Sequence, residues 1–169
     1  MALKTRRRCV AIALDIQSAY DTIDHASLLW KLRELDLPRY LVAWIRAFLD
    51  HRTAVLVVNS IECPFPIRAG VPQGSPLSPT LFLIYIDDLL QQLSQVARCQ
   101  AFADDILIWD IVDTRGSCPM GIQDALHVVE RWSAQWGLTF NVAKCQAIDI
   151  TIRRASPPLD LQLHGLVVT

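Results

Sequence analysis

Apolar residues recur at two different spacings along the chain, and the changes in spacing predict the order of strands and helices. Residues 8–16 are apolar at nearly every position, which predicts a buried strand. Residues 27–35 and 41–49 carry apolar side chains at helical spacing and predict two helices separated by Leu37-Pro38. The second of these helices is predicted to have one apolar face, made of Leu41, Trp44, Ile45, Phe48 and Leu49.

The middle of the chain predicts a hairpin, a loop and a long helix. Residues 53–58 and 63–67 are short β-prone runs on either side of Asn59-Ser60, which indicates a hairpin. Residues 70–79 are dense in glycine and proline and predict a loop, whereas residues 80–95 predict a helix.

The rest of the chain predicts a second hairpin, a helix and two more strands. Short apolar runs flank Asp104-Asp105, as expected for a hairpin with these two residues at its tip. After this hairpin the sequence predicts a loop at residues 116–119, a helix at 122–136 and a strand at 146–152. Ser156-Pro157-Pro158 predicts a turn, and residues 159–168 predict a final strand. The helix is predicted to turn four side chains inward: Leu126, Val129, Trp132 and Trp136. Because strands and helices mix without a regular repeat, the pattern favours an α+β fold, with helices packed on one face of a sheet.

Length and composition indicate one globular domain. The chain has 169 residues, of which 52% are hydrophobic and 20% charged, and no apolar run reaches the roughly 18 residues of a membrane span. The five cysteines form no C-x-x-C pair, so zinc is not expected. We expect a reducing, intracellular compartment, and the choice between nucleus and cytoplasm stays open. The net charge of −1 is low for a complete nucleic-acid enzyme.

The two adjacent aspartates carry the clearest chemical signal. Carboxylates side by side at a hairpin tip repel each other, so their placement makes sense if a divalent cation lies between them and a third carboxylate. Asp15, at the end of the first apolar run, is a plausible third. This combination points to metal-assisted phosphoryl transfer.

Four motifs in order resemble those of reverse transcriptases, most closely the version found in non-LTR retrotransposons, with relatives in group II introns and retrons. The four segments are Leu14-Asp15-Ile16-Gln17-Ser18-Ala19-Tyr20-Asp21, Gly70-Val71-Pro72-Gln73-Gly74-Ser75-Pro76-Leu77-Ser78-Pro79, Ala101-Phe102-Ala103-Asp104-Asp105 and Gly137-Leu138-Thr139-Phe140-Asn141-Val142-Ala143-Lys144-Cys145. The second is the most specific, and the set covers most of the chain. The resemblance implies the palm of an RNA-directed DNA polymerase, with an antiparallel sheet and helices on one face.

The resemblance also implies a role for individual residues. Asp15 and Asp104 would hold two Mg²⁺ ions, or Mn²⁺ in their place, with the backbone carbonyl of Ile16 as a further ligand and Asp105 as the weaker partner. Lys144 would approach the leaving pyrophosphate as a general acid or as a simple positive charge.

Four further residues are implied to bind substrate. An aromatic at Tyr20 would leave no room for a 2′-hydroxyl and so select deoxynucleoside triphosphates, and Gln73 and Gly74 would face the template base or the nucleotide. Phe102 is also expected at the substrate. The implied nucleic-acid partners are an RNA template and a DNA primer, and no membrane is expected. Asp21, Asp24 and His25 fit the start of a helix and are expected to be structural.

A second Asp-Asp pair, in Tyr85-Ile86-Asp87-Asp88, also matches the third motif as a string of letters. Its neighbours suit an uninterrupted helix, and it comes too soon after Gly74 for the intervening helix of the family. Asp87 and Asp88 are therefore predicted to be polar positions of a helix.

Three alternatives stay open beside a reverse transcriptase palm. An RNA-dependent RNA polymerase shares the palm, but Tyr20 argues against it. A palm kept as a non-catalytic module that binds nucleic acid or protein would not need the acids, and a decayed transposon copy would have no function. The family pattern also implies that residues 1–169 are one palm domain, with the fingers mostly absent before residue 9 and the thumb absent after residue 169. Those segments of a parent polyprotein are expected partners, and activity of the chain alone stays open.

Overall fold

A computed structural model describes residues 7–113, 120–151 and 159–168 of the chain. The chain divides into two compact units, which are called the sheet unit, Met1–Gln17 with Ile86–Thr169, and the helical unit, Ser18–Tyr85. The expectation of a single domain over residues 1–169 stays a prediction.

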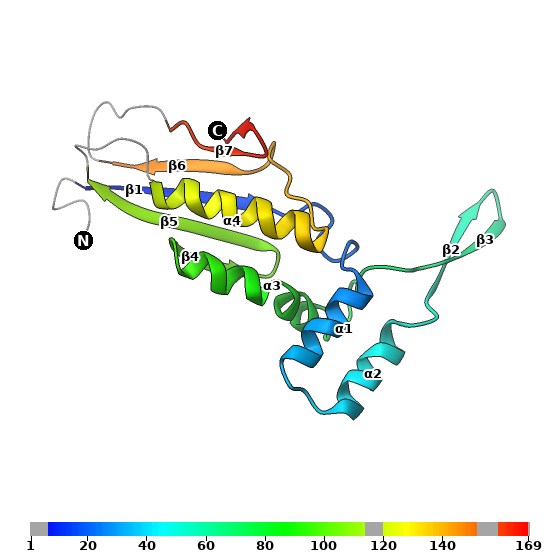
Figure 1. Ribbon diagram of the computed structural model, residues 1–169. Helices are drawn as coiled ribbons and strands as arrows, with labels where there is room; N and C mark the ends of the chain where they lie inside the picture. Colours follow the sequence, from blue (N-terminus) through cyan, green and yellow to red (C-terminus); the bar gives the residue numbers. More distant parts are fainter. Residues whose placement is uncertain (1–6, 114–119, 152–158, 169) are drawn as a thin grey trace. The chain divides into compact units, whose positions relative to one another are not determined.

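A four-stranded antiparallel sheet forms the centre of the sheet unit (Figure 1). In spatial order its strands are β4 (Arg98–Phe102), β5 (Asp105–Asp113), β1 (Arg7–Asp15) and β6 (Gln146–Ile150). β1 is a central strand, and its alternate residues Val10, Ile12 and Leu14 are at most 2% exposed, so one face of the sheet is fully covered.

One helix covers this buried face. Helix α4 (Met120–Trp136) contacts both β1 and β5 and runs along the sheet in Figure 1. Leu126, Val129 and Trp132 are buried as predicted, whereas Trp136 is half-buried. The predicted fold class, an α+β palm with an antiparallel sheet and helices on one face, is confirmed.

Three helical segments and a separate hairpin make up the helical unit. They are α1 (His25–Glu34), α2 (Arg39–Leu49), the strands β2 (Thr53–Val58) and β3 (Ile61–Pro66), and the first part of α3 (Ser78–Ser94). The Asp24 side chain caps α1 by accepting a hydrogen bond of 2.7 Å from the Ser27 backbone N–H. β2 and β3 pair with each other around Asn59-Ser60, as the sequence predicts.

Two predictions of local structure are wrong. The predicted final strand over residues 159–168 is a short hairpin, β7 (Gln162–Leu163) and β8 (Leu166–Val167), because His164 and Gly165 take left-handed backbone angles that turn the chain. The predicted apolar face of α2 includes Trp44, which is 57% exposed, while Val42 is buried instead. The predicted loop at 116–119 and turn at 156–158 lie outside the described residues.

Within the described part of the chain, no helix has the length and apolar character needed to cross a membrane.

Candidate active site

The strand register places two of the predicted catalytic carboxylates opposite each other. Asp15 ends β1, Asp105 begins β5, and the two residues are direct cross-strand partners. The Asp15 carbonyl accepts a hydrogen bond of 2.9 Å from Asn141 on its other side, so Asp15 and Asp105 form the closely spaced type of antiparallel pair. Such pairs have Cα atoms roughly 4.5 Å apart and side chains on the same face. Since Leu14 points into the core, the two carboxylates lie on the opposite face.

Asp104 is next to this pair, at the tip of the predicted hairpin. Phe102 pairs with Asp105, which leaves Ala103 and Asp104 as a two-residue turn. Ala103 has a left-handed backbone angle, with φ of 53°, which is uncommon for a residue with a side chain. Asp104 is exposed, and Phe102 is 82% exposed at the end of β4. The turn therefore presents a carboxylate and an aromatic ring to solvent.

The backbone around Ile16 directs a carbonyl toward the same hairpin. Ile16 forms an antiparallel bridge with Phe140, made by the bonds Gln17 N–H to Thr139 O (2.8 Å) and Asn141 N–H to Asp15 O (2.9 Å). In this pattern the bridged residue's own N–H and C=O point away from its partner. The Ile16 carbonyl therefore points to the side of β1 on which β5 and the turn at Asp104 lie.

A lysine approaches Asp15 from the segment before β6. Lys144 Nζ lies 3.9 Å from Asp15 Oδ2, with the lysine side chain 68% exposed and the aspartate 35% exposed. Cys145 beside it is buried, and burial raises the pKa of its thiol, so it is protonated at neutral pH and is not a nucleophile. Asp15, Asp105 and Lys144, predicted from three separate motifs, thus come together at one end of the sheet.

The donor set can be tested for its fit to the divalent ions that the sequence predicts. Among residues 7–113, 120–151 and 159–168, no three His, Cys, Asp or Glu side chains converge closely enough to hold a metal ion. Mg²⁺, however, is usually bound by one or two carboxylates plus the phosphates of a substrate, not by a cage of protein ligands. The Asp15–Asp105 pair, with the Ile16 carbonyl and Asp104 beside it, fits that kind of site.

The helical unit carries Tyr20, whose backbone is held closely by the loop of the second motif. The Val71 N–H donates to the Tyr20 carbonyl over 2.7 Å. Gly70 has φ of 79°, and a Cβ built on it would lie 2.7 Å from both Cα and O of Asp21. The Tyr20 ring is half-buried, with its centroid 5.2 Å from that of Phe82. Only glycine therefore allows the loop to approach Tyr20 this closely.

Gln73 makes a side-chain contact with the first motif. Its Nε2 lies 3.0 Å from both carboxylate oxygens of Asp21. Asp21 therefore fixes the loop and does not take part in the start of α1, where Asp24 is the cap. Gly74, next to Gln73, has φ of 83°, and a Cβ built on it would have nothing within 4 Å.

The sequence did not single out Arg52 as part of this loop. Arg52 Nη1 donates to the Gly70 carbonyl over 2.9 Å, and His25 Nε2 lies 2.8 Å from the same oxygen. His25 was expected at the start of α1, and it occupies that position while also reaching the loop. Nothing in the local pattern around Arg52 signals its contact, which depends on the path of the chain after α2.

The second Asp-Asp pair is helical, as predicted. Asp87 and Asp88 lie inside α3, where Asp87 accepts a hydrogen bond of 2.7 Å from Gln91. Asp88 accepts one of 3.0 Å from the indole N–H of Trp132 in α4. This pair therefore joins two helices and does not end a strand.

An antiparallel sheet whose two central strands carry paired aspartates at one edge, backed by helices, defines the palm of a nucleic-acid polymerase. Residues 1–155 match the family described as reverse transcriptase (RNA-dependent DNA polymerase). The chain belongs to this reverse transcriptase family.

Proteins similar to this chain include polymerases of mobile elements and telomerases. The chain is 30% identical over 175 residues to the RNA-directed DNA polymerase from mobile element jockey of Drosophila melanogaster, covering 99% of this chain and 19% of that protein. It is 32% identical over 155 residues to a Pol polyprotein from the type-2 retrotransposable element R2DM of the same species, covering 85% of this chain and 14% of that protein. These relatives bear out the resemblance to non-LTR retrotransposons.

Telomerase from Candida tropicalis, solved in complex with a fragment of telomeric RNA, has a similar fold. The TM-score is 0.63 at 16% identity, over 97% of this chain and 29% of that one. The apo telomerase truncated from its C-terminal domain gives a TM-score of 0.62. The chain spans less than a fifth of the length of the jockey polymerase it matches.

Proposed function

We propose that this chain is the catalytic palm of an RNA-directed DNA polymerase of a non-LTR retrotransposon. It adds deoxynucleotides to the 3′-hydroxyl of a DNA primer on an RNA template. The observation that carries the proposal is the register that makes Asp15 and Asp105 direct partners on the two central strands. Membership of the reverse transcriptase family and the names of the relatives support the same activity.

The proposed ligands of two Mg²⁺ ions are the carboxylates of Asp15, Asp104 and Asp105 and the carbonyl of Ile16, with Mn²⁺ as a possible substitute. Bound to such ligands, the ions supply a lower pKa for the primer hydroxyl and neutralise charge on the triphosphate and its leaving group. The carboxylates face solvent, away from the buried face of the sheet, so substrate oxygens can complete the coordination.

The other residues act on the incoming nucleotide. Lys144, already close to Asp15, carries a positive charge toward the leaving pyrophosphate and can donate a proton to it. Tyr20 excludes a 2′-hydroxyl, because its ring lies against Phe82 and its backbone is fixed by the Gly70 loop. Gln73 and Gly74 present an amide and open backbone to the template base or nucleotide, and Phe102 offers an exposed ring.

A non-catalytic palm is the second candidate, and an RNA-dependent RNA polymerase is the third. A module that only binds nucleic acid or protein has no use for like charges held opposite each other on adjacent strands, where they repel. The tyrosine at position 20 favours deoxynucleotides over ribonucleotides. Both alternatives therefore make predictions that differ from those of the proposed function.

The metal site can be tested on the chain itself by thermal melting with and without Mg²⁺. At ten times its dissociation constant, a ligand that binds only the native state adds about 1.4 kcal/mol, which is roughly 3–6 °C for a chain of this size. We expect this rise in the parent and in Asp87→Asn, and its loss in Asp15→Asn and Asp104→Asn. Equal Mg²⁺ responses in all four proteins would exclude the metal site.

The activity can be tested by replacing the matching segment of the jockey polymerase with this chain. Primer extension on an RNA template should occur with the chimera and should fall by several orders of magnitude in its Asp15→Asn variant. Extension that is unchanged in this variant would contradict the catalytic role of the palm. A Mg²⁺ response without extension by the folded chimera would favour the non-catalytic module.

A further inference from the structure

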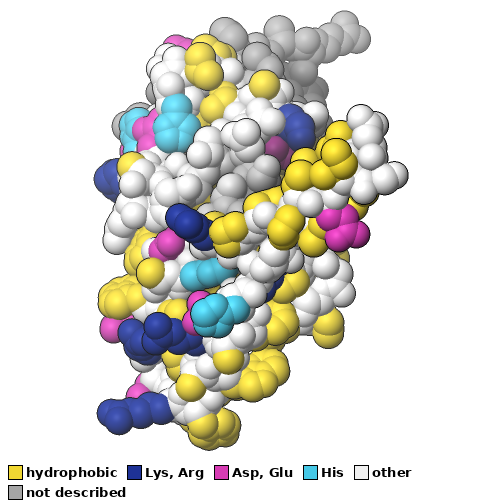
Figure 2. Space-filling view, turned by 90° about the vertical axis from the view of Figure 1, so that its right-hand side faces the viewer, with side chains coloured by type: hydrophobic (Ala, Val, Ile, Leu, Met, Phe, Trp, Pro, Cys, Tyr) yellow, Lys and Arg dark blue, Asp and Glu magenta, His cyan; other side chains and the backbone are white. Residues whose placement is uncertain are grey.

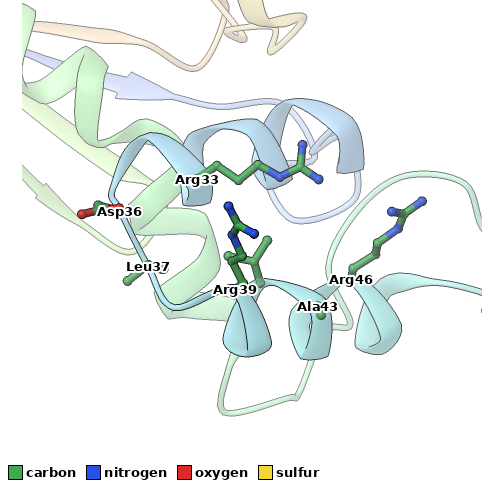
Figure 3. Close-up of a pocket in the computed structure, with 7 residues that line it drawn as sticks. Arg33, Asp36, Leu37, Arg39, Ala43 and Arg46 are labelled. Atoms are coloured by element: carbon green, nitrogen blue, oxygen red, sulfur yellow. The ribbon is translucent and has the colours of Figure 1, made fainter.

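A groove between α1 and α2, which no step of the proposed reaction uses, is lined by three arginines. Arg33 comes from α1, and Arg39 and Arg46 come from α2. Figure 3 shows Arg39 pointing from α2 toward α1, Arg33 extending along α1, and Arg46 extending from α2. The groove has a volume of about 480 Å³. These residues and their lining neighbours are called the arginine groove.

The charge of the arginine groove is not balanced by nearby acids. Asp36 is its one acidic lining residue, against three guanidinium groups. In the part of the chain that the structure describes, the ion pairs Arg8–Asp149, Arg98–Asp110 and Lys144–Asp15 involve other residues. The first turn of α2 also has no acidic residue. Three exposed arginines held close together without carboxylate partners repel one another, so the groove favours an anionic ligand.

The volume and the remaining lining residues suit a sugar–phosphate backbone. Leu37, Val42 and Ala43 give the groove an apolar side, while the guanidinium groups stand around it. Planar guanidinium groups bind phosphate oxygens in pairs of parallel hydrogen bonds. A groove of about 480 Å³ with several arginines can therefore hold successive phosphates of one strand, and a single free phosphate would not fill it.

The adjacent surface of the same helices carries exposed aromatic rings. Tyr40 is 78% exposed, Trp44 57% and Trp30 50%. Tyr40 and Trp44 are four residues apart on α2, so they share one helix face, next to the face of Arg39 and Ala43. Figure 2 likewise shows Lys and Arg side chains close to hydrophobic ones on the surface it draws. Aromatic platforms beside a basic groove are typical of proteins that bind single-stranded nucleic acid, whose unpaired bases can stack.

We propose that the arginine groove binds the phosphate backbone of single-stranded nucleic acid, whose bases stack on Tyr40 and Trp44. The strand is the RNA template, an assignment that rests on the proposed function. The groove adds a binding surface outside the four motifs and gives a chain of net charge −1 a local site for a polyanion.

Binding of a fluorescently labelled 20-nucleotide RNA to the full chain, measured by anisotropy at several salt concentrations, tests the groove. Each phosphate contact on a single strand contributes about 0.7 to the slope of log affinity against log salt. Arg33→Gln, Arg39→Gln and Arg46→Gln should each weaken binding several-fold and reduce the slope by about 0.7. Arg131→Gln, an exposed arginine of α4 with the same change of charge, is the matched control and should change neither.

Trp44→Ala separates stacking from charge. It should weaken RNA binding about tenfold while leaving the salt slope unchanged, because a base–aromatic contact releases no counterions. The circular dichroism spectra of all variants should match that of the parent, since the substituted side chains are exposed.

Three outcomes would overturn the proposal. Arginine variants with the parent's affinity and slope would show that the groove does not contact RNA, and a parent that binds no RNA would do the same. If inorganic phosphate stabilises the parent but not Arg39→Gln while both bind RNA equally, the groove is a small-anion site. The Mg²⁺ melts keep this test apart from the proposed function, because Asp104→Asn should keep RNA binding and the arginine variants should keep the Mg²⁺ response.

Discussion

Gly70→Ala is the substitution that most directly tests how the second motif holds Tyr20. The new Cβ would lie 2.7 Å from Cα and O of Asp21 and 2.8 Å from O of Tyr20, all of them backbone atoms that no rotamer change can move. Gly70 also has φ of 79°, in the left-handed region. The neighbouring Gly74 has nearly the same angle, 83°, but nothing within 4 Å of its Cβ position. The two alanine variants therefore share the backbone strain and differ in the clash.

The magnitudes follow from these two effects. Left-handed backbone costs an alanine about 1–2 kcal/mol, and this applies to both variants. Overpacking costs a further 1–3 kcal/mol at Gly70 alone, and more if the hydrogen bond of 2.7 Å from Val71 N–H to Tyr20 O is broken. We expect Gly74→Ala to lower the free energy of unfolding by about 1–2 kcal/mol and Gly70→Ala by about 2–5 kcal/mol.

Urea unfolding followed by circular dichroism measures both values. Equal slopes against urea would show that the unfolded states are comparable, so that the midpoints report stability. In the jockey chimera, Gly70→Ala should also weaken selection against ribonucleotides, because the displaced backbone carries Tyr20. Gly74→Ala should leave this selection unchanged. Free energies of unfolding of the two variants that agree within about 0.5 kcal/mol would refute the close approach of the loop to Tyr20 and Asp21.

Three further predictions concern single side chains. Tyr20→Ala in the chimera should admit ribonucleotides that the parent rejects, and unchanged discrimination would mean that this ring is not the selecting group. Asp24→Ala should cost about 1 kcal/mol at pH 7. The hydrogen bonds from Ser27 hold the Asp24 pKa below its ordinary value of 3.8, so this stabilisation is present above about pH 4 and is lost as the pH falls through the folded-state pKa. Urea titrations at pH 7 and in acid should therefore show the difference between parent and variant shrinking, and a difference that grows in acid would contradict the cap. Asp88→Ala should cost about 1–3 kcal/mol in a urea titration, because it removes the charged acceptor of the buried Trp132 indole, whereas a loss within 0.5 kcal/mol would place the hydrogen bond's contribution near zero.

The sequence determined most of the secondary structure, because those signals are local. The buried strand β1, the helix α4 and both longer hairpins follow from spacing and turn residues within a few positions of each other. The helical assignment of Asp87 and Asp88 is local in the same way, since the apolar pattern around them continues without a turn. The family motifs also selected Asp15, Asp105 and Lys144, which the structure brings together.

Burial was less well predicted, because it depends on what packs against an element. Trp44 has helical spacing with buried residues, yet it is 57% exposed, with the ring of Phe48 from the same helix stacked beside it. The alternation of apolar and polar residues over 159–168 predicts one strand, but His164 and Gly165 take left-handed backbone angles. The resulting turn divides the segment into β7 and β8.

Only the tertiary structure decided the contacts that give the site its geometry. The pairing of Asp15 with Asp105 depends on the register of a nine-residue ladder, and a shift by one residue would turn one carboxylate to the buried face. The contacts of Gln73 with Asp21, of Arg52 with Gly70, and of three arginines around one groove join residues whose separation in sequence carries no local pattern. Such contacts are set by how the helices, strands and loops pack once they have formed. The spacing of residues along the chain could therefore identify some of these residues, but it could not predict which of them are in contact.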